Sequence, residues 1–153
     1  MILKLPQGWR RDPFRSQASG STDIFLGPIS ASVGEMAEPQ LLVKTVPTPE
    51  ETTNFQAIAV ALKQQQLTAG GGEVLAALTE ATLVIDGHPA RLDAFTYRDQ
   101  ALQSVVMQCQ GCIQRLGAVC IVMGIARTAN QADYLPFFKQ VLNGLQFTDN
   151  AGV

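Results

Sequence analysis

Apolar and polar residues alternate along several short segments of the chain, a pattern that predicts β-strands. Proline, glycine and serine separate these segments and indicate turns. The expected strands are residues 2–5, 22–26, 40–46, 73–78, 81–85, 90–97, 102–113 and 118–127, with a weaker candidate at 29–33. Asp86-Gly87 is typical of a tight hairpin. Residues 12–22 are rich in serine, glycine and glutamine, and we expect them to form a flexible connection.

Two segments have the apolar spacing of a helix instead. Thr48-Pro49-Glu50-Glu51 offers a capping residue, a proline suited to the first turn and a glutamate that completes a capping box. Apolar residues then recur three and four positions apart on one helical face, at Phe55, Ile58, Ala59 and Leu62. The glycines at 70–72 end this helix. A second helix is expected over residues 133–143, beginning at Asp133.

The order of these elements is strands, helix, a run of strands and a final helix. It predicts an α+β fold in which helices pack on an antiparallel β-sheet. Because the chain does not alternate strand and helix, we expect no parallel sheet with a nucleotide-binding crevice. A chain of 153 residues has the size of one domain. We assign residues 1–150 to this domain and residues 151–153 to a tail.

Charge and hydropathy limit the classes of partner. The formal net charge is −2, and only 16% of the residues are charged. A protein without excess cations is poorly suited to nucleic acid or to an anionic membrane as its main partner. The first residues lack the regions of a signal peptide, and the most apolar stretch, residues 118–126, is far shorter than a membrane-spanning helix. These features predict a cytoplasmic protein that does not insert into membranes.

Cys109-Gln110-Gly111-Cys112 is the one motif that suggests metal or redox chemistry. Both cysteines fall in the predicted strand 102–113, where alternation points them to opposite faces. A zinc site needs four ligands, and beyond these two cysteines the chain offers only Cys120 and His88. We therefore predict structural cysteines and no cofactor. A zinc or thiol site at Cys109 and Cys112 remains an alternative.

Glutamines are concentrated on one face of the same predicted strand. That face contains Val106, Gln108, Gln110, Cys112 and Gln114. In the next strand, small residues at even positions from 118 to 126 form one face, and larger apolar residues at odd positions from 119 to 125 form a predicted core face. A surface of small apolar residues and neutral amides can receive another chain without the cost of burying a charge. Two interpretations stay open: this face binds a partner, or one of the protein's own helices covers it.

At this level of detail the chain resembles the DcrB-related (DUF1795) proteins, which have a Mog1/PsbP-like fold, and most of all the Eag chaperones of bacterial type VI secretion. The similarity extends over residues 3–148 and includes the closing helix. The matching segments are Leu5-Pro6-Gln7-Gly8-Trp9, Ser21-Thr22-Asp23-Ile24-Phe25, Ile85-Asp86-Gly87-His88-Pro89-Ala90 and Met107-Gln108. The best of them is the glycine–histidine hairpin with a glutamine about 20 residues later.

The resemblance implies a sandwich with a curved antiparallel β-sheet flanked by helices, commonly paired as a homodimer. Eag proteins are not enzymes; they hold the apolar transmembrane helices of an effector and help to load it onto the VgrG spike. By this resemblance Ile24 and Leu42 are apolar contacts and Gln108 is an amide contact. The expected client-binding residues are Thr22, Ile24, Leu42, Val106, Gln108 and Gln110, although Thr22 stands where family members often have an aliphatic residue.

Two hypotheses compete with a cytoplasmic chaperone. The first is an extracytoplasmic accessory protein of the PsbP or DcrB type, which would normally carry a leader. The second is a zinc or thiol enzyme built on Cys109, Cys112 and Cys120. A sheet face with little charge also predicts self-association into a homodimer, because two-fold pairing would bury that face.

Overall fold

The secondary structure follows most of the sequence pattern. The structure is a computed structural model that describes residues 4–5, 8–18, 22–26, 40–47, 55–69, 74–99, 104–115, 117–127 and 131–147. Its strands are β1 (Arg10–Arg11), β2 (Thr22–Leu26), β3 (Gln40–Pro47), β4 (Val74–Ile85), β5 (His88–Asp99), β6 (Ser104–Arg115) and β7 (Ala118–Arg127). Its helices are α1 (Pro13–Ala18), α2 (Phe55–Ala69) and α3 (Gln131–Asn143).

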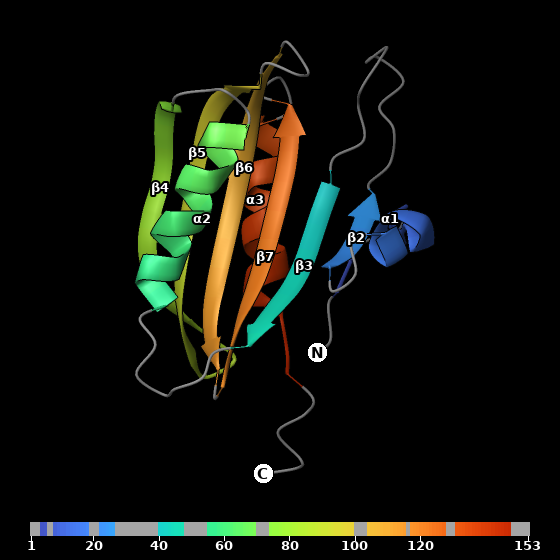
Figure 1. Cartoon of the computed structure of the whole chain (residues 1–153), viewed down its shortest axis with the longest axis vertical. Coiled ribbons are helices and arrows are strands. Elements are labelled where there is room, and N and C mark those ends of the chain that lie inside the picture. Colours follow the sequence, from blue (N-terminus) through green and yellow to red (C-terminus); the bar gives the residue numbers. More distant parts are fainter. Residues whose placement is uncertain are drawn as a thin grey trace.

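All seven strands belong to one curved antiparallel sheet with the order β1-β2-β3-β7-β6-β5-β4. Figure 1 shows α2 in front of the sheet and α3 behind it. The chain passes from β3, inside the sheet, to β4 at its far edge, and α2 crosses the front face in between. This is the predicted α+β fold with helices packed on an antiparallel sheet, so that prediction is confirmed.

Two short hairpins set the pairing of the last four strands. Asp86 and Gly87 have positive φ values of 48° and 79°, as a two-residue hairpin requires, and they place Ile85 opposite His88. Gly117, with φ 73°, lies in the turn that places Arg115 opposite Ala118. From these turns the register between β5, β6 and β7 runs without a shift. From Val106 to Ile113, each residue of β6 therefore has a defined neighbour on either side.

The larger core lies between the sheet and α3. Phe138, Val141 and Leu142 of α3 are buried against the sheet. Two strand positions beneath them are glycines, and both leave room for the helix. A Cβ atom at Gly124 would lie 2.5 Å from Cγ of Phe138, and one at Gly111 would lie 2.6 Å from a Cδ atom of Leu142. The close approach of α3 therefore depends most on glycine at position 124, because the ring of Phe138 is rigid whereas the end of Leu142 can turn.

Several boundaries differ from the prediction. β5 and β6 are shifted or extended by two residues at each end, and β1 was not expected. Residues 13–18 form α1 inside the expected flexible connection, because Asp12-Pro13 supplies a capping residue followed by a proline at the first helical position. β4 is one strand where two were expected, since β5 offers a continuous partner and two register shifts absorb the irregularity. α3 begins at Gln131, not at Asp133.

The remaining predicted elements lie wholly or partly outside the described residues. These are the strands at 2–5 and 29–33, the helix start at 48–51 and the glycines at 70–72. In the described part of the chain, none of the helices is both long enough and apolar enough to cross a membrane.

Candidate functional site

The six expected client-binding residues lie at positions of one sheet face, the face on which α2 packs. The register defines a row of opposed residues across the sheet. Ile24 of β2 lies opposite Leu42 of β3, Leu42 opposite Met123 of β7, and Met123 opposite Gln110 of β6. The row continues through Asp93 of β5 to Glu80 of β4. It therefore changes from apolar side chains at β2 to polar and charged side chains under α2.

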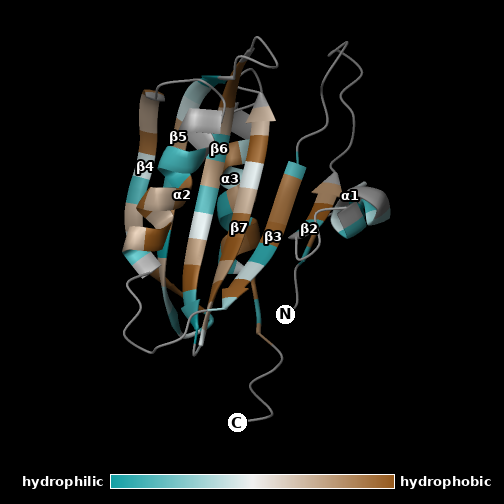
Figure 2. Ribbon diagram, in the orientation of Figure 1, coloured by the Kyte–Doolittle hydropathy of each residue, from teal (hydrophilic) through white to brown (hydrophobic). Residues whose placement is uncertain are grey.

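The apolar half of this face is partly open. We call its five half-buried aliphatic residues the aliphatic strip: Ile24, Leu42, Val46, Met123 and Ile125. They come from β2, β3 and β7, whereas α2 makes its main contacts with β5 and β6. Figure 2 shows that hydrophobic residues make up most of β2 and β3. α2 covers the strip only in part: Val46 and Met123 pack against the cluster that contains Ala59 of α2, and all five residues stay half-buried.

The short helix α1 holds the outer end of the aliphatic strip in place. The backbone N–H of Ile24 donates to Oγ of Ser16 at 2.9 Å, and the backbone N–H of Asp12 donates to the carbonyl of Ile24 at 2.7 Å. Ser16 itself is buried, with 2% of its surface exposed. α1 therefore satisfies the backbone of β2 at Ile24, which fixes the position of that side chain in the row. Thr22 lies at the end of the same strand, opposite Lys44.

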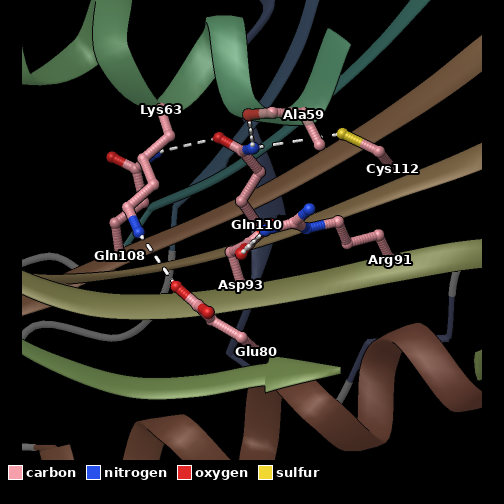
Figure 3. Close-up of polar contacts among 8 residues, drawn as sticks. All are labelled: Ala59, Lys63, Glu80, Arg91, Asp93, Gln108, Gln110 and Cys112. Carbon is pink, nitrogen blue, oxygen red and sulfur yellow. Dashed lines mark hydrogen bonds and ion pairs between the residues drawn. The ribbon is translucent and has the colours of Figure 1, made fainter. Parts of the chain in front are cut away.

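The other expected residues, Val106, Gln108 and Gln110, lie on the covered half of the face. Each has at most 1% of its surface exposed. The side chain of Gln110 donates from Nε2 to the backbone carbonyl of Ala59 in α2 at 3.0 Å (Figure 3). The protein's own helix therefore covers the glutamines, as one of the two interpretations expects, whereas the residues of the aliphatic strip are half-buried. That the strip binds a partner stays a prediction.

Gln108 is a buried amide whose hydrogen bonds are incomplete. Its Nε2 donates to Oε1 of Gln110 at 3.4 Å and contacts the sulfur of Met123 at 3.3 Å. Its Oε1 has no hydrogen-bond partner. An unpartnered buried acceptor costs about 1–3 kcal/mol. Gln108 therefore lies between the aliphatic strip and the polar side chains under α2, since it contacts Met123 on one side and Gln110 on the other.

Two ion pairs lie farther along the same face, toward β4: Arg91 with Asp93, and Lys63 with Glu80 (Figure 3). Asp93, only 1% exposed, accepts two hydrogen bonds from the guanidinium of Arg91, at 2.9 and 3.0 Å. These bonds raise the pKa of Arg91 above its ordinary value. Lys63 of α2 reaches Glu80 at 3.4 Å and lies 4.9 Å from the ring centre of Phe95. α2 thus packs on a mixed surface. Its Ile58, Ala59 and Leu62 belong to a hydrophobic cluster with sheet residues that include Cys112, Val119 and Ile121, and the polar contacts lie beside this cluster.

One interpretation of the faces is wrong. The small residues of β7 do not share a face with the glutamines, because Gln110 lies opposite Met123 and Gln108 opposite Ile125. The small face of β7 instead packs under α3, where Gly124 admits Phe138. Of the residues predicted as core on the opposite face of β7, Val119 and Ile121 are buried as expected, whereas Met123 and Ile125 are half-buried at the edge of core clusters and belong to the aliphatic strip. The hairpin at residues 115–118 could have revealed this, because it fixes which residues of β6 and β7 oppose each other.

The cysteines lie as strand alternation predicts. Cys109 packs in the core beneath α3, and Cys112 packs on the opposite face beneath α2. Burial raises the pKa of both thiols to about 12, and that of Cys120 to about 11. The nucleophilic thiolate is therefore scarce at neutral pH. Among the residues described here, no group of three or more histidine, cysteine or acidic side chains is arranged to hold a metal ion.

The fold is similar to solved structures of distant sequence. PA94 from Pseudomonas aeruginosa, a protein of unknown function suggested to be a regulator, is 20% identical, with a TM-score of 0.64 over 97% of this chain and 92% of that chain. LpqN from Mycobacterium tuberculosis, which is involved in cell envelope biogenesis, is 14% identical, with a TM-score of 0.60 over 94% of this chain and 80% of that chain. No protein-family model matches the chain, and no curated protein sequence does. These likenesses establish the fold.

Proposed function

We propose that this protein is a non-enzymatic chaperone or adaptor that shields an apolar helix of another protein on its aliphatic strip. The observation that carries the proposal is the row of half-buried aliphatic side chains on an open sheet face, formed by Ile24, Leu42 and Met123. Following the family resemblance, the client is the transmembrane segment of a type VI secretion effector, which the protein helps to load onto the VgrG spike.

The dimensions of the aliphatic strip suit one helix. It extends over three adjacent strands, β2, β3 and β7. Neighbouring strands are about 4.8 Å apart, so the strip is about 10 Å wide. An α-helix with its side chains is about 10–12 Å in diameter. A single client helix could therefore lie along the strands beside α2 and cover the strip.

The chemistry of the aliphatic strip favours a client without charges. None of its five residues is polar, and burying their apolar surface is favourable by about 25 cal/mol per Å². A transmembrane helix is apolar on all sides and must be kept from water before it reaches a membrane. In this proposal Val106, Gln108 and Gln110 hold α2 in place, and they would contact the client only if α2 moved.

Aspartate substitutions in the aliphatic strip test the proposal. Ile24→Asp and Leu42→Asp would each place an unpaired charge under the client helix, which should weaken binding at least about tenfold. Val84→Asp is the matched control, since Val84 is an aliphatic strand residue that is 69% exposed and lies on β4, outside the strip. Each variant is co-expressed with an effector segment that contains an apolar helix, and the soluble complex is measured by size-exclusion chromatography. Circular dichroism checks that each variant is folded.

The outcome separates three cases. Loss of the soluble complex in folded Ile24→Asp and Leu42→Asp, but not in Val84→Asp, supports the proposal. Retention of the complex in all three variants would show that the helix binds elsewhere. Failure of Ile24→Asp to fold would identify the row as ordinary core and not as a binding surface.

We also propose that the protein forms a homodimer. Apart from the aliphatic strip, Leu75 of edge strand β4 and Val60 of α2 are large exposed apolar residues, 51% and 44% accessible. Two-fold pairing would remove such residues from water. Light scattering at micromolar concentration should give twice the mass of one chain, and the mass of a single chain would contradict the proposal.

A second candidate function is an accessory role in the cell envelope. It is favoured by the likeness of the fold to LpqN, a protein involved in cell envelope biogenesis. Fractionation of cells that express the full native reading frame distinguishes the two. Recovery in the cytoplasm favours the chaperone, whereas recovery with the envelope favours the accessory role.

A further inference from the structure

A second concave surface lies on the opposite side of the sheet, away from the aliphatic strip. It is an open cleft of about 510 Å³ between the N-terminal segment and the second half of α3. The cleft is lined by Lys4, Leu5, Phe137, Gln140, Val141 and Gly144. Its volume falls within the range of about 300–1,000 Å³ that is common for small-molecule sites. Neither α2 nor any residue of the proposed client site contributes to it.

The lining is divided between an apolar wall and two hydrogen-bond donors. Leu5, Phe137 and Val141 provide the apolar wall, and Gly144 adds no side chain. Trp9 supports this wall from behind, since its ring stacks on that of Phe137 with centres 4.9 Å apart. Such a surface suits an alkyl chain, which has no hydrogen bonds to lose on leaving water.

The polar part of the cleft favours a negatively charged group on the ligand. Lys4 is the single charged residue in the lining, and its ammonium has no ion-pair partner among the described residues. Gln140, on the exposed side of α3, brings an amide with two further donors. An ammonium and an amide can both donate to an anionic oxygen, and hydrogen bonds between charged groups are about twice as strong as neutral ones.

We propose that this cleft binds a single-chain anionic amphiphile of the fatty-acid class. The carboxylate lies against Lys4 and Gln140, and the alkyl chain lies along Leu5, Phe137 and Val141. A cationic amphiphile would meet the Lys4 ammonium and bind weakly, and a short anion such as acetate would lack the apolar contact. The proposal is independent of the chaperone function, because the two sites share no residue and lie on opposite faces of the sheet.

Titration with dodecanoate below its micelle concentration tests the proposal. Trp9 is the only tryptophan in the chain and stacks on the cleft wall, so its fluorescence should change and saturate at one ligand per chain. Calorimetry gives the affinity independently. Dodecyltrimethylammonium, which has the same tail and the opposite charge, should bind about tenfold more weakly, and acetate should not bind.

Two pairs of variants locate the site. Lys4→Met should weaken dodecanoate binding about tenfold and remove the preference over dodecyltrimethylammonium. Lys44→Met, which changes an exposed lysine on the other face, is its matched control and should behave as the wild type. Gln140→Phe should fill the cleft and abolish binding, whereas Gln64→Phe at an exposed position of α2 should not.

Three results would overturn the proposal. The first is equal affinity of the wild type for both charged amphiphiles. The second is dodecanoate binding that neither Lys4→Met nor Gln140→Phe alters. The third is cosedimentation with phosphatidylglycerol vesicles without any binding of free dodecanoate, because this would identify attraction to a membrane surface. If Gln140→Phe fails to fold, the charge preference of Lys4→Met alone decides.

Discussion

The packing of α3 on the sheet can be tested at Gly124, where an added methyl group would clash with an aromatic ring. A Cβ atom built on Gly124 lies 2.5–2.6 Å from three ring atoms of Phe138, closer than two carbon atoms can approach. Phe138 is 1% exposed, and the rings of Trp9, Tyr134 and Phe137 surround it with centres 5.4–6.4 Å away. The ring therefore has no free space into which to move.

The expected cost of Gly124→Ala follows from two opposing terms. Overpacking in a close-packed core costs about 1–3 kcal/mol. Gly124 does not have a positive φ, so alanine fits its backbone conformation. Alanine also lowers the entropy of the unfolded chain, which stabilises the folded state by about 0.4–1 kcal/mol. We expect a net loss of about 1–2 kcal/mol in the free energy of unfolding.

Gly111→Ala is the matched control on the neighbouring strand. Its Cβ would meet only the two terminal methyl groups of Leu142, at 2.6 and 3.1 Å. A leucine can turn its end aside for about 0.5–1.5 kcal/mol, which the gain in unfolded-state entropy largely offsets. We therefore expect Gly111→Ala to change the stability by less than about 0.5 kcal/mol.

Urea unfolding followed by circular dichroism measures both variants. A double-mutant cycle with Phe138→Ala isolates the contact, because this change removes Cγ as well as the rest of the ring and Gly124→Ala should then cost almost nothing. The reasoning is refuted if Gly124→Ala is as stable as the wild type, or if Gly111→Ala is the more damaging change. It is also refuted if the cost of Gly124→Ala persists in the Phe138→Ala background.

Two further predictions concern buried ionisable groups. The pKa of each of the three thiols is raised in the folded state above 9.0, so the protonated thiols stabilise the fold fully below about pH 9, and this contribution is lost as the pH rises toward 11–12. The free energies of unfolding from urea titrations at pH 8 and 10 should differ by about 1.4 kcal/mol per thiol, with the lower value at pH 10. Cys112→Ala should reduce this difference by about 1.4 kcal/mol, and an unchanged difference would contradict the assignment. Arg91→Met should cost about 3–5 kcal/mol, because it leaves Asp93 buried without its partner. Thermal unfolding measures this loss, and the double variant Arg91→Met/Asp93→Leu should recover most of it; no recovery would show that Arg91 contributes through packing alone.

The sequence by itself determined the elements whose signals are local. Alternation marked β2, β3 and β5 to β7, helical spacing marked α2 and α3, and Asp86-Gly87 marked a hairpin that the structure contains. Alternation alone also separated Cys109 from Cys112, because successive side chains of a strand point to opposite faces. Even α1 has a local signal, the pair Asp12-Pro13, although it lies in a segment whose composition suggests a loop.

Only the tertiary structure decided which part of the face is open. Val106, Gln108 and Gln110 share the face of Ile24 and Leu42, as expected, yet α2 covers the first three and leaves the other two half-buried. The path of α2 depends on where β4 joins the sheet, because the helix must cross the face between β3 and the far edge. Strand order is a long-range property, and periodicity reports only which residues share a face. The hairpin at residues 115–118 already fixes that Met123 and Ile125 share the face of the glutamines, but their place beside Leu42 of β3, and thus in the aliphatic strip, emerged only from the folded sheet.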